Sequence, residues 1–192
     1  MKNVLKKLEL LLLAISFAST TLLAQSHQIS NGNFVVAGTS TLHDWTMEST
    51  KVDGIANIKM EGNQISSIEQ FDVKLNAESL KSGKSTMDNI SYKSLKSEEH
   101  PLISFKVTNI KSLTYAGTTA NIVASGVLTI AGVSNTVDVS GTAENNNGNV
   151  KLEGSKNIKM TDFEIEPPTA VFGTIKTGDE LTINYILNLK TK

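Results

Sequence analysis

The segment that most constrains the fold of this chain is residues 126–141, GVLTIAGVSNTVDVSG. Apolar side chains recur there with a period of two on both sides of Gly132. Such alternation, rich in Val, Ile and Thr around a glycine, is typical of a β-hairpin. Gly132 can adopt the positive φ that a two-residue turn or a bulge requires. Ala131 is a poor first residue for the mirror-image turns, so the register of the hairpin stays open.

The same alternation recurs along most of the chain and predicts about eight strands. A strand of a dozen residues would be roughly 40 Å long at ~3.3 Å per residue. One helix is predicted over residues 85–95, capped by Ser85 or Thr86 and apolar on one face. An antiparallel sheet of this size closes into a barrel or splits into a sandwich, and long strands favour the barrel. We therefore predict an all-β, antiparallel barrel with one short helix. The predicted strands are residues 34–38, 45–47, 52–60, 65–76, 103–107, 119–130, 133–139, 151–160 and 181–189.

The N-terminus predicts export. Three lysines within the first seven residues precede a largely apolar run, and Ala24 and Ser26 occupy the −3 and −1 positions of a signal peptidase site. The run is too short and too rich in Ser and Thr to span a bilayer well. We expect a signal peptide over residues 1–26, with cleavage after Ala24 as the alternative, and one domain over residues 27–192. The expected location is the periplasm, with an extracellular location as the alternative, and His27 would stand in a disordered mature N-terminus.

Composition excludes several classes of protein. The chain has no Cys and no Arg, and loss of three lysines and one glutamate with residues 1–26 changes its net charge from −1 to −3. An acidic chain without Arg argues against nucleic acid as a partner. Without Cys there are no disulfides, so the fold must be held by its core. About 166 residues suffice for one such core.

No set of residues in the sequence points to catalysis. The histidines are His27, His43 and His100, and nothing in the sequence brings them together into a metal site or an acid–base pair. Phosphate-binding glycine loops and nucleophile motifs are absent from the sequence. Carboxylates at 162, 164, 166 and 179 lack the spacing of a calcium loop and are expected to form a solvated rim. We expect no enzyme activity, no metal and no cofactor.

The candidate binding residues are those whose side chains should point into the barrel. Adjacent side chains of a strand point to opposite faces, so Lys74, Lys106 and Asn184 should face water. The inward set either fills the barrel as an ordinary core or lines a lumen that holds an apolar chain. This set is Phe71, Val73, Ile103, Phe105, Val107, Leu128, Ile130, Ile183 and Tyr185.

Several motifs resemble the YceI-like family of exported lipid-binding barrels. Residues 126–133 resemble its "G-x-L-T-I-x-G-V" hairpin, and residues 100–105 resemble its "Y-P-x-I-x-F" strand, with His100 where Tyr is usual. Residues 161–163 are similar to a family "D-F-G" loop, with Glu164 in place of Gly. Residues 38–45 are similar to the opening of one branch of the family.

The resemblance implies a lipocalin-like barrel in the periplasm that binds a polyisoprenoid or similar amphiphilic lipid in its lumen, without catalytic residues. The first hypothesis is thus a non-catalytic binding or carrier protein. The rival hypothesis is a filled barrel that acts as a structural or protein-interaction module in the cell envelope. The sequence sets neither the identity of the lipid nor the oligomeric state.

Overall fold

The computed structural model describes residues 24–192, so the predicted signal peptide lies almost wholly outside the described residues. Ten strands and three short helices make up the described part of the chain. The strands are β1 (Gln25–Ser40), β2 (Trp45–Ser49), β3 (Val52–Glu61), β4 (Gln64–Asn76), β5 (Leu102–Ala116), β6 (Thr119–Ile130), β7 (Val133–Asn146), β8 (Asn149–Lys159), β9 (Thr169–Ala170) and β10 (Ile175–Thr191). The helices are η1 (Ala77–Ser79), α2 (Ser85–Ser94) and η2 (Thr161–Phe163).

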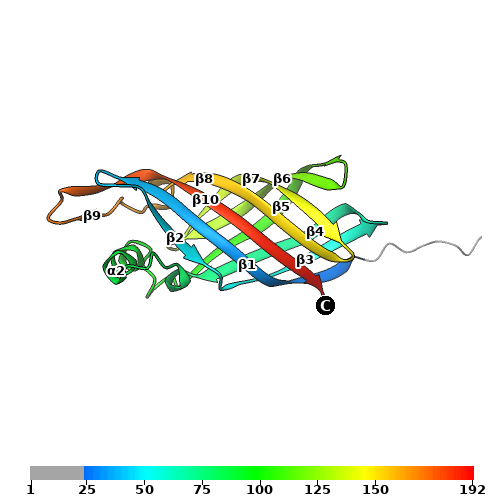
Figure 1. The fold of residues 1–192 in the computed structure, drawn as a ribbon, viewed down its shortest axis with the longest axis horizontal. Helices are drawn as coiled ribbons and strands as arrows, with labels where there is room; N and C mark the ends of the chain where they lie inside the picture. Colours follow the sequence, from blue (N-terminus) through cyan, green and yellow to red (C-terminus); the bar gives the residue numbers. More distant parts are fainter. Residues whose placement is uncertain (1–23) are drawn as a thin grey trace, which may run out of the picture.

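Eight of these strands close an antiparallel barrel in the order β1-β3-β4-β5-β6-β7-β8-β10, and β10 pairs back onto β1 (Figure 1). The predicted all-β barrel with one short α-helix is confirmed. β3 pairs with the beginning of β1, whereas β2 pairs with the same edge of β1 further along. β9 forms a short hairpin with β10. Figure 1 shows α2 and β9 at one end of the barrel and the C-terminus near the other.

The hairpin that opened the sequence argument forms with a two-residue turn. Ile130 pairs with Val133, and both turn residues have positive φ, 51° at Ala131 and 83° at Gly132. Two consecutive residues with positive φ are typical of a type I′ turn, whose twist matches that of the flanking strands. Alanine therefore occupies a position that disfavours it, and the pairing of the long strands on either side stabilises the turn.

Three expectations at the ends of elements were wrong. β1 begins at Gln25 rather than at Phe34, because its polar early residues pair with β3 on one side and β10 on the other. His27 is fully buried in β1, not disordered, and its Nδ1 lies 3.0 Å from the carbonyl oxygen of Gln25. The N-cap of α2 is Lys84, which makes no side-chain cap, instead of Ser85 or Thr86.

The barrel is filled at the end where β1 begins and β10 ends. Buried side chains from seven strands form one cluster there. The turns between β3 and β4, β5 and β6, and β7 and β8 close this end. At the opposite end lie α2 and β9 (Figure 1), and η2 follows directly after the end of β8. The filling cluster is Ile29, Ala56, Ile58, Ile65, Phe71, Val73, Ala120, Ile122, Ala143, Val150, Leu187 and Leu189.

β4 and β5 share only a short stretch of backbone pairing in the barrel wall. They pair only over residues 72–76 and 102–106, and both strands carry bulges beyond that stretch. A bulge adds one residue to a strand and shifts the inward side by one position. The hydroxyl of Tyr115 on β5 bridges the seam: it accepts a hydrogen bond from the Ile65 N–H and donates one to the Ile65 carbonyl at 3.1 Å. The Tyr115 side chain thus replaces part of the backbone hydrogen bonding that β4 and β5 lack.

Candidate functional site

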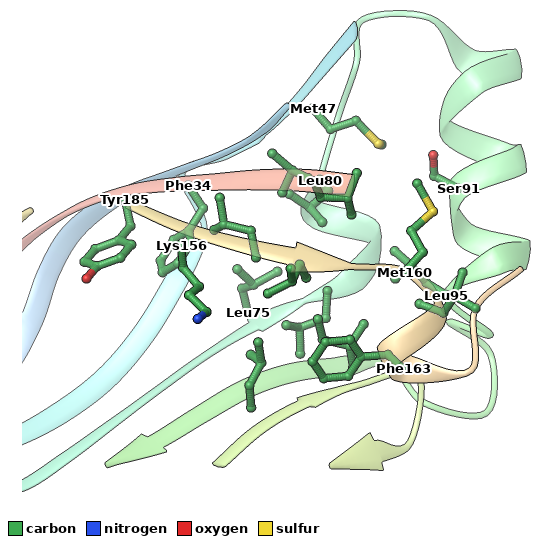
Figure 2. A pocket seen from close by; sticks show the side chains of 18 of the residues that line it. Phe34, Met47, Leu75, Leu80, Ser91, Leu95, Lys156, Met160, Phe163 and Tyr185 are labelled. Atoms are coloured by element: carbon green, nitrogen blue, oxygen red, sulfur yellow. The ribbon is translucent and has the colours of Figure 1, made fainter. Parts of the chain in front are cut away.

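A cavity of about 540 Å³ lies inside the end of the barrel next to α2. Its wall comes from seven of the eight barrel strands, together with β2, α2 and η2, and is formed mostly by aliphatic and aromatic side chains (Figure 2). The barrel is therefore neither wholly filled nor wholly hollow. One end is a packed core, and the other is an apolar pocket that reaches the mouth.

All nine candidate residues from the sequence lie on this wall. They come from β4, β5, β6 and β10, and each is buried or half-buried. Their strand neighbours Lys74, Lys106 and Asn184 are exposed, as the alternation predicted. The nine are Phe71, Val73, Ile103, Phe105, Val107, Leu128, Ile130, Ile183 and Tyr185.

Tyr185 is set into the wall by two glycines. Gly141 and Gly154 face each other across β7 and β8, and a β-carbon on Gly154 would lie only 2.7 Å from Cζ of Tyr185. The Tyr185 hydroxyl donates a hydrogen bond to the Ser140 carbonyl at 3.2 Å, and its ring stacks on Phe34 with 5.9 Å between centroids. Burial raises the pKa of this phenol above its usual value, so it stays protonated near neutral pH.

The helix α2 and the loops at the mouth supply lining residues that the sequence argument did not select. Met87, Ile90 and Leu95 of the α2 region line the cavity, which agrees with the expected apolar face of this helix. Met160 and Phe163 line it from the segment that follows β8. These last two lie in an irregular segment, where no period of two or 3.6 indicates which way a side chain points.

Hydrogen bonds at both ends of α2 hold it over the mouth. Oδ1 of the buried Asp88 accepts hydrogen bonds from the Ser82 N–H and the Ser82 hydroxyl, each at 2.7 Å. Burial alone would raise the pKa of Asp88, but these two bonds outweigh it and hold the pKa below its usual value. The Tyr92 hydroxyl lies 2.9 Å from the Leu80 carbonyl and accepts a hydrogen bond from Lys81 Nζ at 2.6 Å.

Lys156 is the lining residue that sequence reasoning should have found. It lies on β8 in alternation with Ile158 and Leu152, and all three line the cavity. The nine candidates predicted from the sequence include no residue of β8, whether charged or apolar. The signal was present, since residues two apart on a strand share a face.

The histidines and loop carboxylates do not converge. His43 Nδ1 lies 2.7 Å from the Asp44 carbonyl, whereas His100 packs over Gly132. Asp179 accepts hydrogen bonds from the N–H and hydroxyl of Thr161. Within residues 24–192, no three His, Asp or Glu side chains are grouped as metal ligands, and no helix is long and apolar enough to cross a membrane.

Comparison with solved structures finds the same fold in other proteins. BcnA of Burkholderia cenocepacia is 17% identical, with a TM-score of 0.64 over 82% of this chain and 95% of its own. A polyisoprenoid binding domain from Saccharophagus degradans is 12% identical, with a TM-score of 0.65 over 88% of this chain and 99% of its own. The YceI protein of Campylobacter jejuni is 19% identical, with a TM-score of 0.54 over 71% of this chain and 80% of its own.

A comparison with family models identifies the domain. None of the curated proteins is significantly similar to this chain. The model of the YceI-like domain, however, matches residues 22–189, which include the whole cavity wall and all of the barrel strands except the last two residues of β10. The chain therefore belongs to the YceI-like family.

Proposed function

We propose that this chain is a non-catalytic binding or carrier protein that holds a polyisoprenoid or another long apolar lipid in the barrel lumen. The observation that carries the proposal is the apolar cavity of about 540 Å³ under α2, in a barrel whose other end is packed. The nine lining residues predicted from the sequence would contact the chain of the lipid. The polyisoprenoid binding domain of Saccharophagus degradans, which has the same fold, supports this class of ligand.

Burial of hydrocarbon supplies the driving force. Each buried CH₂ contributes about 0.8 kcal/mol, so a few isoprene units give ample gross binding energy. The conformational entropy that a flexible lipid loses on binding offsets much of this energy. The net affinity is therefore far smaller than the buried area implies. The cavity wall is preformed, since Tyr185 and Phe34 already stack in it, and this reduces the side-chain entropy that the protein loses on binding.

The test is mass spectrometry of an organic extract from natively purified protein. The matched pair of variants is Phe105→Asp, on the inner face of β5, and Lys106→Asp, its outward neighbour. We expect a recurring lipid in the wild type and in Lys106→Asp, and its loss in Phe105→Asp, because a carboxylate buried against hydrocarbon is strongly unfavourable. An empty wild-type extract together with no uptake of a fluorescent apolar probe would favour the rival structural module.

The proposed location is the periplasm, reached through a cleaved signal peptide. Gln25 and Ser26 pair with Ile58 and Asn57 of β3, so cleavage after Ala24 would keep both residues in the barrel and cleavage after Ser26 would remove them. Intact mass of the mature protein from the envelope fraction distinguishes these starts. Protein from the envelope fraction that still begins at Met1 would contradict cleavage of the signal peptide.

A further inference from the structure

One lysine extends into the apolar cavity. Lys156 is half-buried on the inner face of β8, where its partner across the ladder with β10 is Ile183, another lining residue. Figure 2 shows its side chain among those of Phe34, Leu75 and Tyr185, which line the same cavity. An ammonium group therefore stands on a wall that is otherwise made for hydrocarbon.

No direct ion-pair partner neutralises the charge of Lys156 in the described part of the chain. In the part of the chain from 24 to 192, its ammonium group has neither a hydrogen-bond partner nor an ion-pair partner. The residues that line the cavity include three lysines but no Asp or Glu. The other two, Lys74 and Lys84, are exposed to solvent, Lys74 by the alternation of β4 and Lys84 at the start of α2.

The acidic residue whose charge acts on Lys156 has its direct contacts elsewhere. Asp138 of β7 is exposed on the outer face of the barrel. There it accepts hydrogen bonds from Lys111 Nζ at 2.6 Å and from the Ser125 hydroxyl at 2.5 Å. The charge of Asp138 also acts on Lys156 through space, but its direct contacts are with Lys111 and Ser125, so Lys156 is left without a direct partner.

An ammonium group that has no direct partner and lies next to hydrocarbon should favour anionic over fully apolar ligands. Burial of a charge without a partner is unfavourable, and a fully apolar ligand would remove water from Lys156 without replacing it. An anionic headgroup would supply both the opposite charge and the hydrogen-bond acceptors.

The position of Lys156 also sets the orientation of such a ligand. Lys156 lies four residues before Met160 along the wall, about 13 Å at ~3.3 Å per residue. Toward the filled end, Leu152 and Leu187 leave little length for a chain, since Leu187 already belongs to the packed cluster. Toward the mouth, the wall is apolar up to α2. A headgroup at Lys156 therefore directs the tail toward the mouth.

We propose that Lys156 is an anchor for the anionic headgroup of the ligand, and that the preferred ligand is an acid-headed amphiphile with a carboxylate or phosphate on a long apolar chain. This inference rests on the proposed lipid-binding function of the lumen. It assigns a headgroup chemistry that an apolar cavity alone does not require.

The experiment measures binding of matched acid and neutral lipids to the delipidated full chain. One arm compares palmitic acid with hexadecanol, and the other compares geranylgeranyl phosphate with geranylgeraniol. The proteins are the wild type, Lys156→Met, Lys156→Arg and the outward control Lys159→Met on the same strand. We expect the wild type to prefer at least one acid over its alcohol by about ten- to hundred-fold.

Lys156→Met should lose this preference and bind the alcohol at least as tightly as the wild type does, because it has no ammonium group to desolvate. Lys156→Arg and Lys159→Met should keep the preference, which excludes an effect of misfolding or of surface charge. The arm that shows the preference identifies the headgroup as carboxylate or phosphate. Equal binding of acid and alcohol by the wild type, or an unchanged preference in Lys156→Met, would overturn the anchor and leave the lipid-binding function standing. Failure of all four lipids to bind would overturn both.

Discussion

The ring of Phe105 lies over Gly126, a residue of the neighbouring strand in the barrel wall. A β-carbon built on Gly126 would be 2.6 Å from Cε2 of that ring, closer than real β-carbons come to other atoms. Phe105 pairs with Leu128, and Gly126 pairs with Val107, so the ring reaches diagonally across the two strands. The absence of a side chain at position 126 therefore lets the ring lie flat against the wall instead of standing in the cavity.

Replacement of Gly126 with Val should push the Phe105 ring into the cavity. We expect a loss of about 1–3 kcal/mol in the free energy of unfolding from overpacking, and reduced uptake of lipid. Urea denaturation and probe binding measure the two effects. The double variant Phe105→Leu/Gly126→Val should recover part of both, because the smaller side chain vacates the space; strictly additive effects would show that the two residues do not interact.

Truncation of Phe105 should be tolerated better with lipid bound than without it. In a filled core, Phe105→Ala would cost roughly 3–5 kcal/mol, but here lipid can occupy part of the vacated space. The control is Leu189→Ala in the filled end, where Leu189 is 1% exposed and a cost of about 2–5 kcal/mol should be the same with and without lipid. Thermal unfolding with and without extracted ligand measures both variants. Equal losses for Phe105→Ala in the two states would place its side chain outside the ligand's reach.

Tyr115→Phe tests the seam between β4 and β5. Loss of the hydroxyl removes both hydrogen bonds to the main chain of Ile65, and we expect a cost of about 1–3 kcal/mol in the free energy of unfolding. Hydrogen exchange should become faster around Ile65 and stay unchanged at the β6–β7 hairpin. Uniformly faster exchange across the barrel would contradict a local role of this residue.

Acid should loosen α2 before it unfolds the barrel. The pKa of Asp88 is held below its usual value, so its contribution to stability is complete above about pH 4 and is lost as the pH falls through the lowered pKa. Hydrogen exchange in α2, followed from pH 6 to pH 3, should accelerate in the wild type. Asp88→Asn should show faster exchange in α2 already at pH 6 and a weaker dependence on pH. A wild-type profile that matches this variant would exclude Asp88 as the titrating group.

Alternation was sufficient to predict the barrel and the wall positions because the strands around Phe71, Phe105, Leu128 and Ile183 keep an uninterrupted period of two. It was insufficient where a bulge intervenes. On β5, for example, Val107, Ile110 and Leu113 pack inward at spacings of three, because one bulge lies between each pair. A bulge depends on how two strands pair, so one strand's sequence does not reveal it.

Contacts between segments that are distant in sequence account for the other positions where the structure differs from the prediction. His27 is buried because β3 and β10 flank the start of β1, and neither strand is near it in sequence. The lining residues Met160 and Phe163 depend in the same way on how the segment after β8 returns over the mouth. Lys156, Leu152 and Ile158 of β8, in contrast, were accessible to the period-two argument but are absent from the candidate set.

The division of the barrel into a packed end and a hollow end separates two kinds of tolerance to mutation. A side chain in the packed end is surrounded by neighbours, so a change of one methylene leaves a void or a clash. A side chain that borders the cavity has partners on one side only and loses fewer contacts when it changes. Substitutions can therefore accumulate in the cavity wall beneath α2 at little cost to folding. Such substitutions would change the width of lipid that the cavity accepts, while the packed end of the barrel stays the same.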